Sequence, residues 1–209
     1  MSTTRQSGFD AVVVIGSQGA LKSFQALLAP LSVGFPVAIV FDLHRGEDFG
    51  ITEQLLARRS ALPVRHAAED GCLEPSTVYL APHDAQLTIG RLGRMRISEP
   101  EGGTGHRFGD RLLASAAEAL GPRLIAVVLS GRLDGGARGV REVKRRGGRV
   151  IVESPQLAAI PSMPNAALAT GCVDFALPAE SIGNALVAMC SVAGAAELFR
   201  VRLNAAVAG

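Results

Sequence analysis

The chain has 209 residues, of which 48% are hydrophobic. A chain of this length and composition buries a sizeable core, which excludes an intrinsically disordered protein. The formal net charge is only +2, and the basic run at residues 144–146 has no interleaved aromatic residues for stacking on bases, so no nucleic-acid partner is expected.

Short apolar segments alternate along the chain with amphipathic ones. Alternation of this kind is typical of an α/β protein, so we expect a doubly wound, mostly parallel sheet with helices on both faces. The predicted strands are residues 12–15, 36–41, 124–129 and 149–152, and the predicted helices between them are residues 21–31, 51–59, 111–119 and 139–146.

Residues 68–99 differ in pattern from this alternation. A strand is predicted at residues 77–80, and a hairpin is predicted at residues 86–98 with its turn near residues 90–93. We therefore expect an antiparallel hairpin at the edge of the sheet. Near the C-terminus, an alanine-rich helix is predicted over residues 179–200, with too many interruptions to span a membrane.

The cellular compartment is predicted from what the sequence lacks. The N-terminal residues have no apolar segment of signal-peptide length, and no segment reaches the roughly 18 uninterrupted apolar residues of a membrane helix. Cys72, Cys172 and Cys190 lack the spacing of a metal site or a redox pair, so we interpret them as small core residues in a reducing compartment. These features predict a cytoplasmic protein that is not inserted in a membrane.

The first predicted strand runs into a short turn and a helix, with the sequence VVVIGSQGALKS. Such a unit cradles a phosphate, binds a dinucleotide or presents a nucleophile. The phosphate loop is disfavoured because Leu21 stands where its second glycine is required, and the dinucleotide fingerprint is disfavoured because Gly16 and Gly19 lack its three-glycine spacing. The nucleophile turn needs a hydroxyl at the carboxyl end of the strand, which Ser17 supplies.

Two further candidate residues follow predicted strands in the same way. His44 follows the strand at residues 36–41, and Asp134 follows the strand at residues 124–129. Because the carboxyl ends of parallel strands converge at one edge of an open sheet, Ser17, His44 and Asp134 can meet as a nucleophile, its general base and the group that orients the base. Each also has a structural alternative, because Ser17 and Asp134 can cap helices and His44 can be an ordinary surface or core-edge histidine.

Several motifs beyond these three residues are similar to those of one enzyme family. Residues 69–71 (EDG) and 78–82 (VYLAP) resemble its segment EDG…P…YIAPGD, and residues 106–107 (HR) resemble the start of its HRPSVD segment. Residues 128–139 resemble its ILTGMGxDGAxG loop, and residues 162–164 (SMP) resemble its GMP segment. On these motifs, the chain resembles the catalytic domain of the chemotaxis protein-glutamate methylesterase, CheB, along almost its whole length.

The resemblance implies a serine hydrolase that removes methyl esters from glutamates of chemoreceptor helices and also deamidates particular receptor glutamines. It implies that Ser17 is the nucleophile, that His44 is the general base, and that Asp134 orients the imidazole. Backbone N–H groups of Gln18 or Gly19 would stabilise the oxyanion. No metal or organic cofactor is implied. The implied partners are methylated chemoreceptor helices or other chemosensory proteins, and the oligomeric state stays open.

The chain departs from the family's motifs in the nucleophile turn and in the aspartate loop. The family has one more residue between the first glycine and the serine, so Ser17 matches only across a deletion. Asp134 stands one place before the family's aspartate, where this chain has Gly135, and Arg132 stands at the family's methionine. These departures keep open an alternative from another class, a CheB-like domain that binds a partner in a chemosensory pathway without turnover.

The resemblance also predicts how the chain is divided. Residues 1–10 are expected to be a flexible N-terminus, residues 11–200 a methylesterase domain of this type without the family's receiver domain, and residues 201–209 a C-terminal tail. We expect the first two predicted strands and the strand at residues 124–129 to be neighbours or near neighbours, because the three candidate residues must share one edge of the sheet.

Overall fold

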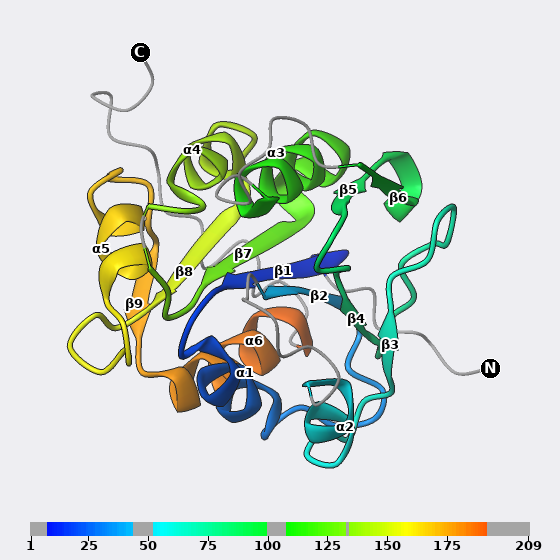
Figure 1. Cartoon of the computed structure of the whole chain (residues 1–209), viewed down its shortest axis with the longest axis horizontal. Coiled ribbons are helices and arrows are strands. Elements are labelled where there is room, and N and C mark those ends of the chain that lie inside the picture. The colour runs from blue at the N-terminus through cyan, green and yellow to red at the C-terminus, as the bar shows by residue number, and fades with distance from the viewer. Residues whose placement is uncertain (1–7, 44–51, 100–107, 133, 192–209) are drawn as a thin grey trace.

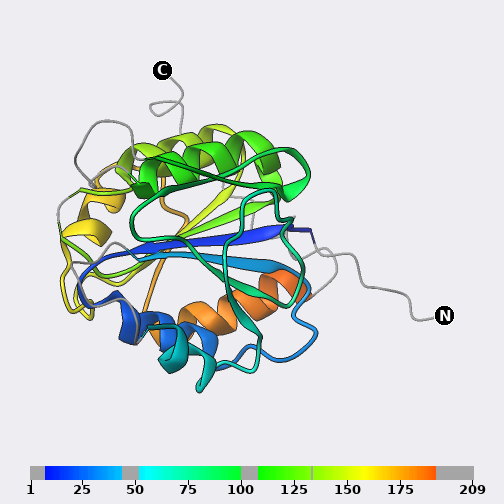
Figure 2. The same cartoon turned by 45° about the vertical axis from the view of Figure 1, so that its right-hand side comes forward.

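The structure of the chain is a computed structural model that describes residues 8–43, 52–99, 108–132 and 134–191. In this described part, one large sheet lies between two layers of helices (Figure 1, Figure 2). Every strand pairing in the large sheet is parallel, which confirms the predicted α/β fold. In spatial order its strands are β3 (Val64–His66), β4 (Val78–Leu80), β2 (Ala38–Leu43), β1 (Ala11–Gly16), β7 (Leu124–Val128), β8 (Arg149–Glu153) and β9 (Phe175–Leu177).

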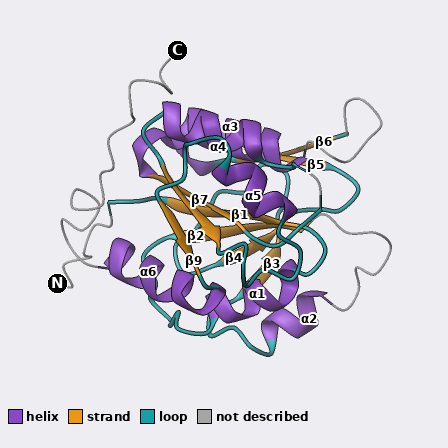
Figure 3. Cartoon of the chain, turned by 90° about the vertical axis from the view of Figure 1, so that its left-hand side faces the viewer, coloured by secondary structure: helices purple, strands orange, loops and turns teal. Residues whose placement is uncertain are grey.

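The helices divide between the two faces of this sheet, as Figure 3 shows from the side. Each group buries its apolar side chains against one of two hydrophobic cores, so both faces of the sheet are covered. One face carries α1 (Ala20–Leu28), α2 (Thr52–Ala57) and α6 (Ala179–Ser191), and the other carries α3 (Phe108–Leu120), α4 (Ala137–Arg145) and α5 (Ser162–Leu168).

The central strands are buried at every position, and their side chains alternate between the two cores. Val14 of β1 and Phe41 of β2 belong to the core under α1, whereas Val13 and Ile15 belong to the core under α3 and α4. The ring of Phe41 stacks on that of Phe24 with centroids 3.7 Å apart, which anchors α1 on the sheet. Apolar residues on both sides of a strand are what a sheet covered on both faces requires.

The carboxyl ends of three central strands lie side by side. Gly16 at the end of β1 pairs with Leu43 at the end of β2, and Ile15 pairs with Val128 at the end of β7. The expectation that these strands are neighbours is therefore confirmed, and the loops that follow them start from one edge of the sheet.

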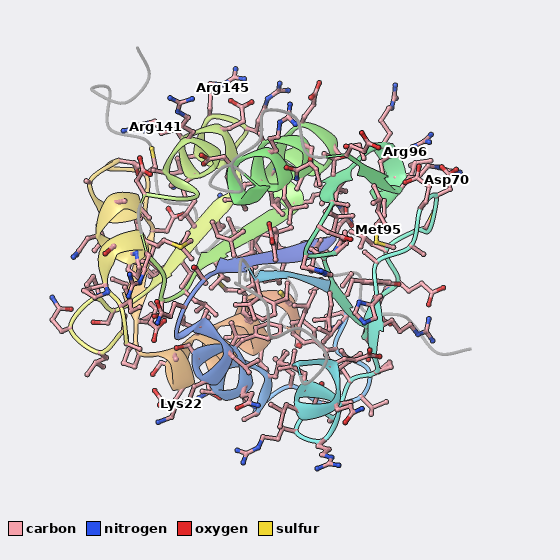
Figure 4. All side chains as sticks on the ribbon, in the orientation of Figure 1. Lys22, Asp70, Met95, Arg96, Arg141 and Arg145 are labelled. Carbon is pink, nitrogen blue, oxygen red and sulfur yellow. The ribbon has the colours of Figure 1, made fainter. Side chains whose placement is uncertain are left out.

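The predicted hairpin is present as β5 (Gln86–Ile89) and β6 (Met95–Ser98), with a short 3-10 turn (Arg91–Gly93) between the strands. It forms a separate two-stranded sheet packed on α3 rather than an extra strand of the large sheet. The strand predicted at residues 77–80 is β4, which lies in the large sheet and is parallel to its neighbours. Figure 4 shows Arg96 of the hairpin beside Asp70, with which it forms a half-exposed ion pair of 3.1 Å.

Some sequence predictions need correction or lie outside the described residues. Cys172 and Cys190 are buried as predicted, but Cys72 is exposed, so the interpretation of all three cysteines as core residues is wrong. The predicted helix at residues 179–200 is described only to Ser191, and the predicted limits of the domain and its two terminal segments stay predictions. No helix within the described residues is long and apolar enough to cross a membrane.

Candidate active site

Ser17 lies in the turn between β1 and α1. Its side chain is half-buried, its backbone N–H donates to the carbonyl oxygen of Ser130 at 3.0 Å, and its carbonyl oxygen accepts from the N–H of Ala20 at 3.0 Å. The N-cap of α1 is Gly19, with φ of 87°, and no side chain caps the helix. The alternative that Ser17 caps α1 is therefore wrong, and the described residues include no hydrogen-bond partner of its hydroxyl.

A glycine lets the loop after β7 lie directly against Ser17. A Cβ atom on Gly131 would stand 2.9 Å from the Cβ of Ser17 and 2.1 Å from the Sδ of Met163. The backbone of Gly131 also donates to the carbonyl oxygen of Ile160 at 3.0 Å and accepts from the N–H of Met163 at 3.1 Å. The loop after β7 is thus held between the candidate nucleophile and the start of α5.

Asp134 lies further along the same loop, with an exposed side chain. The N-cap of α4 is Gly136 and no side chain caps this helix, so the alternative that Asp134 is a helix cap is also wrong. The carboxylate of Asp134 interacts electrostatically with Asp110 in the first turn of α3. The pKa of Asp110 is raised mainly by burial and further by Asp134, against the lowering effect of hydrogen bonds from the backbone of Gly139 and Arg138.

His44 lies outside the described residues, so the geometry of the Ser17, His44 and Asp134 triad stays a prediction. The structure does describe β2 up to Leu43, which pairs with Gly16, the residue before Ser17. Ser17 and the end of β2 therefore share the same edge of the sheet.

Two buried carboxyl groups at this edge were not predicted from the sequence. Glu153 at the end of β8 accepts hydrogen bonds from the N–H of Ser130 and the hydroxyl of Ser23, both at 2.7 Å. Asp42 in β2 is buried, with 8% of its surface exposed, and burial raises its pKa from 3.8 to about 7. An acid within an otherwise apolar strand is the sequence signal for such groups. Within the described residues, no three His, Cys, Asp or Glu side chains are grouped to hold a metal ion.

Residues 12–186 match the family model described as CheB methylesterase. The chain is 34% identical over 183 residues to protein-glutamate methylesterase FrzG of Myxococcus xanthus. This match covers 86% of the chain and 54% of FrzG. It is 32% identical over 189 residues to a protein-glutamate methylesterase/protein-glutamine glutaminase of Rhizobium meliloti (strain 1021). That match covers 89% of this chain and 53% of the relative. The chain spans about half the length of these curated relatives.

A solved structure has the same fold over almost its entire length. The crystal structure of the Thermotoga maritima CheB methylesterase catalytic domain superimposes with a TM-score of 0.77 and 29% sequence identity. The match covers 86% of this chain and 97% of the solved domain. Because the family model also matches most of the sequence, the chain belongs to the CheB methylesterase family.

Proposed function

We propose that the chain hydrolyses methyl esters of glutamates in chemoreceptors, with Ser17 as the nucleophile. The observation that carries this proposal is the turn after β1, which holds a hydroxyl without a structural hydrogen bond from the described residues at the carboxyl edge of the sheet. Relatives named protein-glutamate methylesterase support the reaction, and relatives that are also named protein-glutamine glutaminase support a second reaction on receptor glutamines.

In the proposed reaction, the Ser17 hydroxyl oxygen forms a bond to the acyl carbon of the ester while His44 accepts its proton. The bond from the acyl carbon to the methoxy oxygen then breaks, and His44 returns the proton so that methanol leaves. Water then forms a bond to the acyl carbon while His44 accepts its proton, the bond from the acyl carbon to the Ser17 oxygen breaks, and His44 returns the proton to Ser17, which releases the free glutamate. Asp134 is proposed to orient the imidazole throughout.

The start of α1 supplies donors for the negative charge that develops on the acyl oxygen. The N–H groups of Gln18 and Gly19 lie between Ser17 and the helix, and the described residues include no acceptor for either. The positive end of the helix dipole lies at the same place. Donors that are already oriented stabilise an oxyanion without reorganisation, and this stabilisation lowers the barrier more than any other single effect in many enzymes.

The proposed substrate and setting follow the family. We propose that methylated chemoreceptor helices or other chemosensory proteins are the partners and that the reaction takes place in the cytoplasm. The chain's own residues supply the nucleophile, base and oxyanion donors of this reaction, so the proposal includes no cofactor.

One observation favours the alternative of a binding domain without turnover. The side chain of Asp134 is exposed, has no hydrogen bond or ion pair within the described residues, and lies close enough to Asp110 to raise its pKa. A fluorophosphonate probe, which labels activated serines, distinguishes the two functions. Labelling of the intact chain at Ser17, absent in Ser17→Ala, supports the hydrolase. An unlabelled chain that still binds a receptor fragment supports the binding domain.

A further inference from the structure

The hydroxyl group of Ser130 makes hydrogen bonds to the backbone of two segments, the nucleophile turn and the loop before α5. Ser130 is fully buried, and its Oγ donates to the carbonyl oxygen of Gln18 at 3.0 Å and accepts from the N–H of Ile160 at 2.9 Å. Its own carbonyl oxygen accepts from the N–H of Ser17. One residue of the β7 loop therefore bonds to two successive residues of the nucleophile turn.

The bond to Gln18 fixes the direction of the next N–H group. In a trans peptide the C=O and N–H groups point in opposite directions, and the described chain has no cis peptide bond. Since the carbonyl of Gln18 points at Ser130, the N–H of Gly19 points away from Ser130. Gly19 takes a φ of 87°, and a Cβ there would stand 2.7 Å from the Oγ of Ser130, so only glycine permits this close approach.

Glu153 in turn holds Ser130. Its Oε2 accepts from the N–H of Ser130 and its Oε1 accepts from the hydroxyl of Ser23 in α1. Glu153 is only 3% exposed, and both of its carboxylate oxygens are bonded. The end of β8, the β7 loop and α1 are therefore connected by one buried carboxylate, which leaves Ser130 little freedom to move.

We propose that Ser130 is a positioning residue that aims the N–H of Gly19 at the oxyanion, and that Glu153 keeps Ser130 in place. This inference rests on the hydrolase function proposed above and adds to it the group that orients one oxyanion donor. Ser130 does not touch the substrate in this role. It acts through the Gln18–Gly19 peptide, so its loss misaligns a donor and leaves the nucleophile present.

The test compares two serines with the same hydrogen-bond pattern. Ser115 in α3 accepts from the N–H of Ile89 at 3.1 Å and donates to the carbonyl oxygen of Leu112 at 3.0 Å, but it connects α3 to the hairpin. Ser115→Ala thus removes an equivalent pair of hydrogen bonds at a place distant in the fold from the nucleophile turn. The kcat and KM for methanol release from a methylated receptor fragment are measured for the wild type, Ser130→Ala, Ser130→Thr and Ser115→Ala, with thermal unfolding of each.

Removing an oxyanion donor costs about a hundredfold to a thousandfold in kcat, and misaligning one costs less, so Ser130→Ala should lower kcat about tenfold to a hundredfold. Its KM should stay within about twofold, because the bond matters most in the transition state. Ser115→Ala should keep the wild-type kcat, whatever its effect on the Tm. Ser130→Thr retains the hydroxyl and should recover most of the lost kcat.

A folded Ser130→Ala variant with wild-type kcat overturns the positioning role and leaves the proposed hydrolase intact. An equal loss of kcat in Ser115→Ala also overturns it, because the effect would then follow from lost stability alone. A wild-type chain that releases no methanol overturns both the inference and the proposed function.

Discussion

The backbone N–H of Ser17 donates a hydrogen bond of 3.0 Å to the carbonyl oxygen of Ser130. This bond lies just beyond the paired ends of β1 and β7 and joins the two loops that carry candidate catalytic residues. The backbone of Ser17 is therefore held close to the ends of two central strands, and sites supported by strands are more precise than sites on loops alone.

Gly131→Ala should damage the site by steric pressure. The new Cβ would stand 2.1 Å from the Sδ of Met163 and 2.9 Å from the Cβ of Ser17, so either the thioether or the nucleophile turn must move. We expect a loss of about 1–3 kcal/mol in the free energy of unfolding and at least about a tenfold loss of kcat. Urea denaturation and ester hydrolysis measure the two effects.

The control for this substitution is Gly90→Ala in the hairpin. A Cβ on Gly90 would meet only the carbonyl oxygen of Arg94, at an ordinary 3.5 Å, and its φ of −96° suits any residue. This variant should retain the stability and the activity of the wild type. Full activity in Gly131→Ala would show that the loop does not constrain Ser17.

Asp134→Asn tests the third member of the proposed triad. The side chain is exposed and does not cap α4, so the Tm should stay unchanged. If Asp134 orients His44, kcat should fall by up to about ten-thousandfold, as in the serine-protease triad. Glu118→Gln, at another exposed acid of the α3 and α4 layer, is the matched control and should have no effect.

The same variant has an independent readout at Asp110. Because the charge of Asp134 raises the pKa of Asp110, Asp134→Asn should lower that pKa, as measured by NMR titration. A lowered pKa of Asp110 together with unchanged hydrolysis would confirm where Asp134 lies and exclude it from the triad.

Asp42→Asn should change how stability depends on pH. Burial raises the pKa of Asp42 from 3.8 to about 7, and no hydrogen bond reaches its carboxyl group from the described residues. Between about pH 4 and pH 7, the unfolded chain has lost this proton and the folded chain retains it, so the wild-type free energy of unfolding falls as pH rises. Over this whole pH range the free energy of unfolding of the wild type falls by about 4 kcal/mol.

The asparagine side chain introduced by Asp42→Asn cannot ionise, so the stability of this variant relative to the wild type should increase between about pH 5 and pH 8. Urea denaturation of both chains at these two pH values measures the difference, and Asp84→Asn, at an exposed aspartate, is the control. A difference between Asp42→Asn and the wild type that is equal at both pH values would contradict the shifted pKa.

Much of the fold could be predicted because its central strands are apolar at nearly every position. β1, β2 and β7 have five or six residues each and are fully buried, so composition alone identifies them. β3 and β9 have three residues each and exposed or half-exposed side chains, which leaves no periodicity to detect. The hairpin was predicted from its turn, but its separation from the sheet depends on packing against α3.

In the candidate site, too, the features set by neighbouring residues could be predicted from the sequence, and the contacts between distant segments could not. Ser17 and Asp134 could be placed at strand ends from their neighbours in sequence, but both were compatible with helix caps. The structure excludes that role because Gly19 and Gly136, each with a positive φ, are the N-caps. The bonds that Ser130 and Glu153 make join segments far apart in the chain, and no local pattern indicates them.

The assignment of Ser17 as the nucleophile is tested by methanol release from a methylated chemoreceptor fragment, compared between the wild type and Ser17→Ala. The hydroxyl of Ser17 has no structural hydrogen bond within the described residues, so the substitution should leave the Tm unchanged. We predict steady methanol release by the wild type and a loss of at least about a thousandfold in Ser17→Ala. Equal release by the two chains, or none by a wild type that binds the fragment, would contradict the assignment of Ser17 as the nucleophile of a methylesterase.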